Sequence, residues 1–159
     1  MIREAITFLG SCTCGDVRYR MESEPLIVHC CHCHWCQRET GTSYALNALI
    51  ESDRVTLLQG QPEAVLTPSN SGKGQTIWRC PKCRVALWSN YAGAGDKLCF
   101  VRIGTLDEAD RLPPDIHIFT ASKQPWVVIP DGNKAVEQYY DNKKVWKEES
   151  LARLNQLLA

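Results

Sequence analysis

The chain has 159 residues, enough for one domain with a hydrophobic core, and its 44% apolar and 23% charged residues are ordinary for a globular protein. Eighteen basic side chains balance eighteen acidic ones and form no basic stripe, which argues against nucleic-acid binding. No stretch approaches the roughly 20 apolar residues of a membrane span, so we expect no membrane partner.

The N-terminal residues 1–6 carry charges where a signal peptide would need an apolar run. We therefore expect a cytoplasmic protein. In a reducing compartment, clustered cysteines are metal ligands or catalytic groups more often than disulfides. The count of nine cysteines is odd, which also fits poorly with a fully paired disulfide scaffold.

Short apolar segments separated by Gly, Pro, Ser and Asn predict a mainly β domain. With no repeat or linker, residues 1–159 should form a single unit, with a core over about 10–130 and a helical tail over about 143–159. Turn residues at 69–74 and 91–96 predict two hairpin tips. The expected strands are 16–21, 26–31, 44–50, 76–79, 86–88, 97–104, 116–120 and 126–129.

Two helices are expected. A short one begins near His34 and ends at Thr40, with Gly41 as its C-cap. The second spans about 147–158, where Leu151, Leu154 and Leu158 recur at helical spacing. We expect this stripe to pack against its own domain, with a homodimer contact as the alternative.

Four cysteines predict a closed metal site. Zinc prefers soft thiolates in a tetrahedron, and Cys80 and Cys83 have the Cys-x-x-Cys spacing of a metal-binding turn. Cys12 and Cys14, two residues apart on an extended strand, would face the same way and complete the set. A redox role for Cys80 and Cys83 is the alternative, but no strand-to-helix context supports it.

Three further cysteines predict a second, open zinc. Cys31 and Cys33 share a strand face, and Cys36 lies one helical turn beyond Cys33. Three protein ligands with one free position are the arrangement of a catalytic zinc. Cys30 should point to the opposite strand face, and Cys99 reads as a small buried side chain.

The histidines leave one alternative open. His34 could supply a fourth ligand and close the second site, whereas His32 alternates away from Cys31 and Cys33. The remaining pair, His29 and His117, lack metal-like spacing and are expected to be hydrogen-bonded strand residues.

Three motifs in sequence resemble those of the glutathione-dependent formaldehyde-activating enzyme family, which includes centromere protein V. They are Ser11–Tyr19 (SCTCGDVRY), Cys31–Gly41 (CHCHWCQRETG) and Trp78–Cys83 (WRCPKC). The segments 104–107 and 116–126 follow in the family's order, so the resemblance spans about residues 10–130.

The resemblance implies a β-tent fold, in which two folded antiparallel sheets are bridged by zinc. It implies two zinc sites with the partition already reached: a structural zinc on Cys12, Cys14, Cys80 and Cys83, and an open zinc on the other three cysteines. It also implies the thiol, glutathione, and the reaction, condensation with formaldehyde to S-(hydroxymethyl)glutathione.

One residue departs from the family pattern. Arg84 directly follows Cys83, where the family usually has glycine, a residue suited to a positive φ. Arg84 either strains this turn or takes another conformation and reaches toward an anionic substrate. Arg38 and Arg84 are therefore candidate contacts for a substrate carboxylate, with surface ion pairs as the alternative.

The functional hypothesis is a zinc-dependent carbon–sulfur lyase or synthase, in which Cys31, Cys33 and Cys36 form the catalytic centre. A glutathione-like thiol would add reversibly to formaldehyde or a related aldehyde there. One alternative is a non-enzymatic zinc-braced binding module, with His34 closing the second site. Another is a redox or metal-sensing protein, which needs Cys30 or Cys99 exposed with a depressed pKa.

Overall fold

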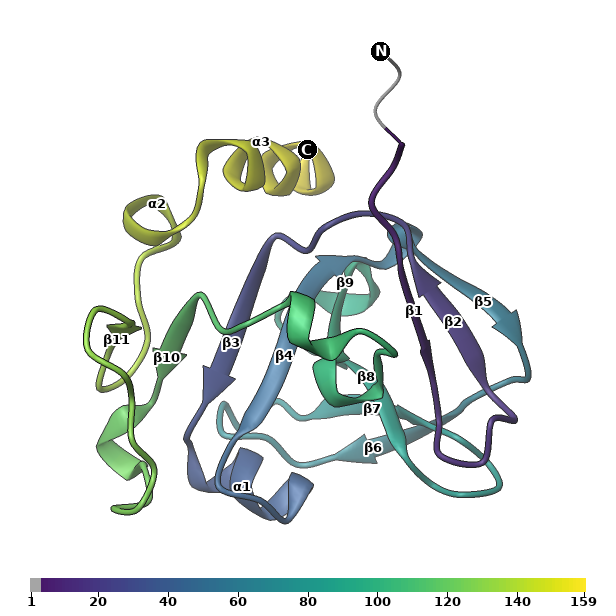
Figure 1. Cartoon of the computed structure of the whole chain (residues 1–159), viewed down its shortest axis with the longest axis horizontal. Helices are drawn as coiled ribbons and strands as arrows, with labels where there is room; N and C mark the ends of the chain where they lie inside the picture. Colours follow the sequence, from purple (N-terminus) through teal and green to yellow (C-terminus); the bar gives the residue numbers. More distant parts are fainter. Residues whose placement is uncertain (1–3) are drawn as a thin grey trace.

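The computed structural model describes residues 4–159, which form two β-sheets that pack against each other (Figure 1). The small sheet has the order β1-β2-β5 and is antiparallel throughout. Its strands are β1 (Phe8–Ser11), β2 (Arg18–Met21) and β5 (Val55–Gln59). Residues 1–3, on which part of the signal-peptide argument depends, lie outside the described residues.

The large sheet has the order β11-β10-β3-β4-β9-β8-β7-β6. Its strands are β3 (Ile27–Cys31), β4 (Ala45–Glu51), β6 (Glu63–Thr67), β7 (Gln75–Arg79), β8 (Ala86–Tyr91), β9 (Leu98–Arg102), β10 (Ile116–Ile118) and β11 (Lys134–Ala135). The prediction of a mainly β fold with two sheets is confirmed. The sheets are not wholly antiparallel, because β10 runs parallel to both β3 and β11.

Most predicted strands are present, with shifted ends. The segments 69–74 and 91–96 connect antiparallel strand pairs, as the turn residues predicted. The strand predicted over 126–129 is wrong, because that segment is turn and irregular chain. β1, β5, β6 and β11 were not predicted.

Both faces of the large sheet are covered, which explains why all five residues of β3 are buried. One face packs against the small sheet, where Val17, Tyr19 and Met21 meet residues such as Ala48 and Val101. The Tyr19 ring lies over Gly10 on β1, where a side chain of any size would overlap it.

The other face of the large sheet is partly covered by the C-terminal tail (Figure 1). The short helix α1 (His34–Thr40) ends at Gly41, as predicted. The tail contains α2 (Asn142–Val145) and α3 (Glu148–Leu158). The stripe of α3 packs on its own domain through Leu151, Leu154 and Leu157, whereas the predicted Leu158 is 57% exposed.

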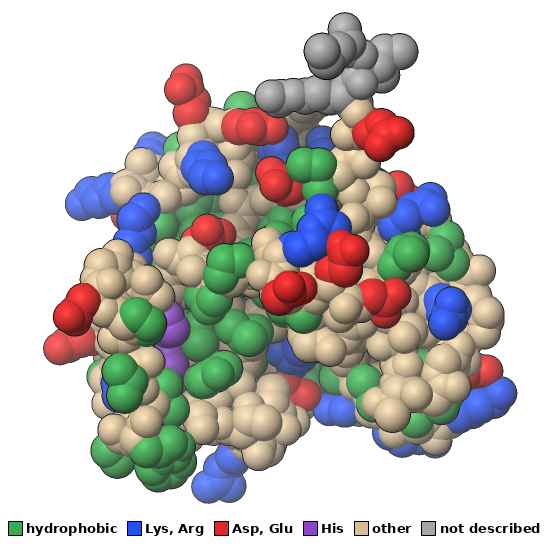
Figure 2. Space-filling view, viewed as in Figure 1, with side chains coloured by type: hydrophobic (Ala, Val, Ile, Leu, Met, Phe, Trp, Pro, Cys, Tyr) green, Lys and Arg blue, Asp and Glu red, His purple; other side chains and the backbone are tan. Residues whose placement is uncertain are grey.

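Short 3-10 turns occupy several connections: Ser52–Arg54, Gly95–Lys97, Ile103–Thr105, Ala109–Arg111 and Thr120–Ser122. On the face shown in Figure 2, basic and acidic side chains are interspersed, in keeping with the balanced composition. Within residues 4–159, every helix is too short or too polar to cross a membrane.

Candidate metal centres

Four cysteines meet where the two sheets come together. Cys12 and Cys14 lie in the turn that follows β1, and Cys80 and Cys83 lie in the turn that follows β7. Their four Sγ atoms are all within 4.8 Å of one another; Cys14 Sγ is 3.6 Å from Cys12 Sγ and 3.7 Å from Cys80 Sγ. This closed cluster therefore joins the small sheet to the large one.

These four cysteines lie together as predicted, but not for the predicted reason. Cys12 and Cys14 are not on an extended strand, because β1 ends at Ser11 and the chain turns at once. The turn brings their sulfurs together, and the N–H of Val17 donates to Cys12 Sγ at 3.3 Å. Backbone N–H groups of Cys14 and Val85 lower the pKa of the Cys83 thiol to about 6, which favours the ligating thiolate.

Arg84 adopts the backbone conformation that glycine would adopt more easily. Its φ is 66°, and its N–H donates to the carbonyl oxygen of Cys80 at 3.0 Å. Its guanidinium pairs with Glu63, and both side chains are more than half exposed. Of the two predicted roles, strain in the turn is the one that the structure supports.

Three cysteines form a second cluster, the open cluster, at the junction of β3 and α1. Cys31 ends β3, Cys33 is the N-cap of α1, and Cys36 lies in its first turn. All three are buried, and their Sγ atoms lie within 4.8 Å of one another. The N–H of Cys36 donates to Cys33 Sγ at 3.3 Å, so the local helix start itself shapes this cluster.

Crowding of the three thiols separates their pKa values. Hydrogen bonds from Cys31 and Cys36 lower the pKa of Cys33 to about 3, whereas the bond with Cys33 contributes to raising that of Cys31 to about 12. The pKa of Cys36 is also raised, chiefly by its hydrogen bonds with the other two. One thiol of this set therefore ionises readily, and a second needs a bound cation before it can lose its proton.

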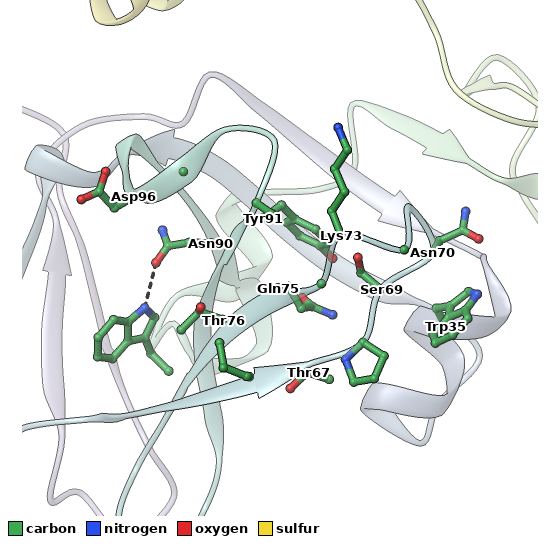
Figure 3. A pocket seen from close by; sticks show the side chains of 17 residues that line it. Trp35, Thr67, Ser69, Asn70, Lys73, Gln75, Thr76, Asn90, Tyr91 and Asp96 are labelled. Carbon is green, nitrogen blue, oxygen red and sulfur yellow. Dashed lines mark hydrogen bonds between the residues drawn. The ribbon is translucent and has the colours of Figure 1, made fainter.

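The open cluster faces a pocket of about 330 Å³. Its walls are mainly neutral and aromatic, with Trp35, Tyr91, Phe100, Phe119 and Tyr139 among them. An adjoining pocket of about 870 Å³ shares Trp35, Gln75 and Tyr91 with it, and Figure 3 shows these side chains around the segment 67–76. A molecule bound at the cluster would therefore contact aromatic rings and side-chain amides of these two pockets.

Two features of this pocket are typical of binding sites. Gln75 is 7% exposed and lines both pockets, yet its Oε1 has no hydrogen-bond partner within residues 4–159. Phe119 has a φ of 55°, a costly conformation for a bulky residue. Unpaired buried acceptors and residues with a strained backbone are both found at sites where a ligand provides the compensating contact.

The C-terminal tail supplies one wall of the pocket. Tyr139 lines it and stacks on Tyr140 with ring centroids 4.7 Å apart. The Tyr140 hydroxyl forms a hydrogen bond with His29, which is 2% exposed. His29 is thus a hydrogen-bonded strand residue, as expected, and burial lowers its pKa to about 4.

These pocket residues were not predicted from the sequence. Gln75, Phe119 and Tyr139 come from distant segments, and no spacing rule connects them to the cysteines. The structure does not bring Arg38 or Arg84 into this pocket; Arg38 lies beside His34 and Gln37 in a separate depression on α1. His34 is exposed and is not part of the three-thiol group.

A third group of potential ligands lies nearby. Cys30, His32 and His117 are buried, and one ligand atom from each falls within 4.8 Å of the others. Cys30 and Cys99 do not meet the requirement of the redox alternative, because both are buried. Burial raises the pKa of Cys30 to about 12 and also raises that of Cys99.

Taken together, the fold and these groups define a mainly β protein with cysteine clusters that could hold metal ions. The sequence model of the glutathione-dependent formaldehyde-activating enzyme family matches residues 7–122, and the chain belongs to that family. The match contains both cysteine clusters and ends before Tyr139.

Two similar proteins can be compared with the chain. A Halomonas elongata protein named "Putative glutathione-dependent formaldehyde-activating enzyme" is 27% identical over 125 residues, which cover 76% of this chain and 79% of that protein. A crystal structure of a Rhodobacter sphaeroides protein covers 63% of this chain and 88% of its own, with 18% identity and a TM-score of 0.46. That score is too low to establish a common fold.

Proposed function

We propose that this protein is a zinc-dependent carbon–sulfur lyase of the S-(hydroxymethyl)glutathione synthase type. A glutathione-like thiol would add reversibly to formaldehyde or a related aldehyde. In the forward direction a C–S bond forms, the carbonyl π bond breaks, and the proton of the thiol ends on the carbonyl oxygen. The observation that carries the proposal is the cluster of three buried thiols that faces a pocket with aromatic walls.

The donor sets fit zinc. Four thiols within 4.8 Å in the closed cluster are a complete tetrahedral set for a structural ion. Cys31, Cys33 and Cys36 would hold a second ion with one position left for an outside ligand. When bound there, zinc would favour the thiolate form of a coordinated thiol and so supply the nucleophile.

The chain's own residues would position the two reactants. With both reactants bound, the aromatic walls would leave little room for water at the cluster, which would limit competing hydration of the aldehyde. Burial raises the pKa of Tyr91, so its hydroxyl stays protonated and can donate to an aldehyde oxygen. The unpaired Oε1 of Gln75 would accept an N–H from the peptide part of the thiol.

The charged groups of glutathione need contacts outside this neutral pocket. Lys73 lines the adjoining pocket and is our first candidate for a carboxylate (Figure 3). Arg38 remains a second candidate from its place on α1. Arg84 is a weaker one, because its guanidinium already pairs with Glu63.

The proposal is tested in two steps with zinc-loaded protein. Calorimetric titration with glutathione should give binding, whereas S-methylglutathione, which cannot form a thiolate, should bind at least tenfold more weakly. NMR exchange spectroscopy with formaldehyde should then show faster interconversion of free and thiol-bound formaldehyde.

Cys99→Ser is the matched control, because Cys99 is buried but belongs to none of the three groups. It should behave as the wild type, and Cys33→Ser should lose both binding and rate enhancement. If no thiol binds, or if Cys33→Ser retains full activity, the proposal fails.

A further inference from the structure

We propose that Cys30, His32 and His117 form a third metal site for a borderline-soft divalent ion such as Zn²⁺. This site would be separate from the closed and open clusters and does not depend on the proposed reaction. The three residues come from β3, from the chain directly after it, and from β10.

The sheet register brings these side chains together. His117 on β10 is the direct cross-strand neighbour of Cys30 on β3. His32 follows Cys30 by two residues, so both point to the same face of the extended chain. Cys31 and Cys33 point to the opposite face, toward the pocket, so one strand would present two different ligand sets on its two sides.

The interatomic distances are close to those of a tetrahedral ion. With Zn–N of about 2.05 Å and Zn–S of about 2.3 Å, tetrahedral angles require about 3.3 Å between two nitrogens and about 3.6 Å between nitrogen and sulfur. Cys30 Sγ lies 3.5 Å from His32 Nε2, which shares a hydrogen bond of 2.9 Å with His117 Nδ1. Insertion of an ion would replace this hydrogen bond, separate the two nitrogens by about 0.4 Å and turn both nearly parallel rings toward the ion.

The ligands are held by a rigid framework. The backbone N–H of His32 donates to the carbonyl oxygen of Ile118. The carbonyl oxygen of His32 accepts hydrogen bonds from the side chains of Gln37 and Ser122. The Tyr44 ring packs against the His32 ring with centroids 5.5 Å apart. Such preorganisation lowers the conformational cost of binding an ion.

Burial and donor chemistry select the ion. Cys30 is 1% exposed, His32 is 0% exposed and His117 is 7% exposed, so His117 provides the side from which an ion would enter. Two imidazoles and one thiolate favour zinc or cobalt over magnesium or calcium. Binding would release the thiol proton of Cys30 to solvent, with the imidazole protons left on His32 Nδ1 and His117 Nε2.

The metal content of purified, zinc-loaded and desalted protein tests this proposal. Elemental analysis should find one fewer zinc per chain in Cys30→Ser than in the wild type. Cys99→Ser, which removes an equally buried cysteine outside the three groups, should keep the wild-type content. Equal content in all three proteins would overturn the proposal.

Two further measurements distinguish loss of the third site from misfolding of the Cys30→Ser variant. His117→Gln removes a ligand from another strand, should retain the far-ultraviolet circular dichroism of the wild type, and should also lose one zinc. Cadmium-113 NMR of the wild type should contain a resonance for one sulfur and two nitrogens, upfield of resonances from cysteine-only sites. Absence of that resonance from the cadmium-loaded wild type would also refute the third site.

Discussion

Arg84 has an unfavourable backbone conformation beside the closed cluster. A non-glycine residue in the left-handed region costs roughly 1–2 kcal/mol. Its ion pair with Glu63 offsets little of this, because both side chains are exposed to solvent. The turn after β7 therefore tolerates Arg84 but does not need it.

We expect Arg84→Gly to raise the free energy of unfolding by about 0.5–1 kcal/mol, because the strain is removed while unfolded glycine has more entropy to lose. Urea denaturation of metal-loaded protein measures the change. Arg84→Ala keeps the unfavourable φ and should shift stability by less than about 0.5 kcal/mol. A destabilised Arg84→Gly would mean that the ion pair with Glu63 is worth more than we infer.

Gln75 carries a prediction about binding that follows from the proposed function. Gln75→Leu removes an unpaired buried acceptor, so the unliganded protein should not lose stability. The KM for the thiol should rise about tenfold with kcat unchanged, because one hydrogen bond of about 1.4 kcal/mol to bound substrate is lost.

Steady-state kinetics at saturating formaldehyde gives this comparison. Gln61→Leu is the matched control, since Gln61 is exposed and lines neither of the two pockets at the open cluster. An unchanged KM in Gln75→Leu would remove Gln75 from the binding site.

Among the elements, helix α1 carries Cys33 and Cys36 of the open cluster at its start and is capped by Gly41 at its end. Gly41 has a φ of 70°, and its N–H donates to the carbonyl oxygen of Gln37 at 2.8 Å. Apart from its two chain neighbours, no atom of residues 4–159 lies within 4 Å of the position of an added Cβ, so a substitution there changes backbone energy and not packing.

Gly41→Val should therefore lower the free energy of unfolding by about 2 kcal/mol, because a β-branched residue is forced into the left-handed region. Gly41→Asn should cost less than half as much, since asparagine tolerates that conformation. Chemical denaturation of both variants gives the comparison, and equal costs would contradict the argument from φ.

The tail helix α3 is fastened by a nearly buried ion pair. Arg153 donates to both carboxylate oxygens of Glu51, whose side chain is only 6% exposed. Ser150 Oγ also donates to the carbonyl oxygen of Leu26 at 2.7 Å. These bonds and the leucines of α3 hold the tail against β3 and β4.

Arg153→Met should destabilise the protein by about 2 kcal/mol at pH 7, less than a fully buried pair costs, because Arg54 also lies near Glu51. Burial opposes ionisation of Glu51, but the bonds from Arg153 hold its pKa below the ordinary value. A lowered pKa adds stability above the unfolded value of about 4.3, and this stability is lost as pH falls through the folded pKa.

The difference between wild type and Arg153→Met should therefore shrink below about pH 4. Thermal unfolding at a series of pH values measures it, with Lys147→Met, an exposed basic residue at the start of α3, as the control. A difference independent of pH would mean that Arg153 acts through packing alone.

For the whole molecule, the closed cluster lies between the two sheets, and the proposed zinc would connect them there through metal–thiolate bonds. The small sheet has only three strands, the lower limit for independent stability, and its buried face packs on the large sheet, so it should depend on this interface and on the proposed zinc connection. Loss of a structural zinc should therefore affect the small sheet more than the large one.

We expect a strong chelator to speed amide hydrogen exchange in β1, β2 and β5 by at least tenfold, about 1.4 kcal/mol, with a smaller change in β3, β4 and β9. Mass spectrometry of peptic fragments measures this. Cys83→Ser should give the same pattern without chelator, and an unchanged small sheet after metal removal would contradict a structural role.

Local signals in the sequence were sufficient for some elements. Cys33, Cys36 and Gly41 define α1 because capping and helix ending depend on neighbours within one or two turns. β6 (Glu63–Thr67) escaped prediction because it is an edge strand that is mostly exposed and has little apolar alternation. Strand 126–129 was predicted from apolar residues that the fold leaves exposed, as at Trp126 and Val128.

The sequence by itself determined the local cysteine groups 12/14, 31/33/36 and 80/83, since thiolates two or three residues apart can share an ion in almost any local fold. Only the tertiary structure decided what surrounds them. Tyr139 reaches the pocket because α3 anchors the tail, and His117 meets Cys30 because β10 runs parallel to β3. Such contacts depend on strand pairing and chain return over long separations, which local spacing does not encode.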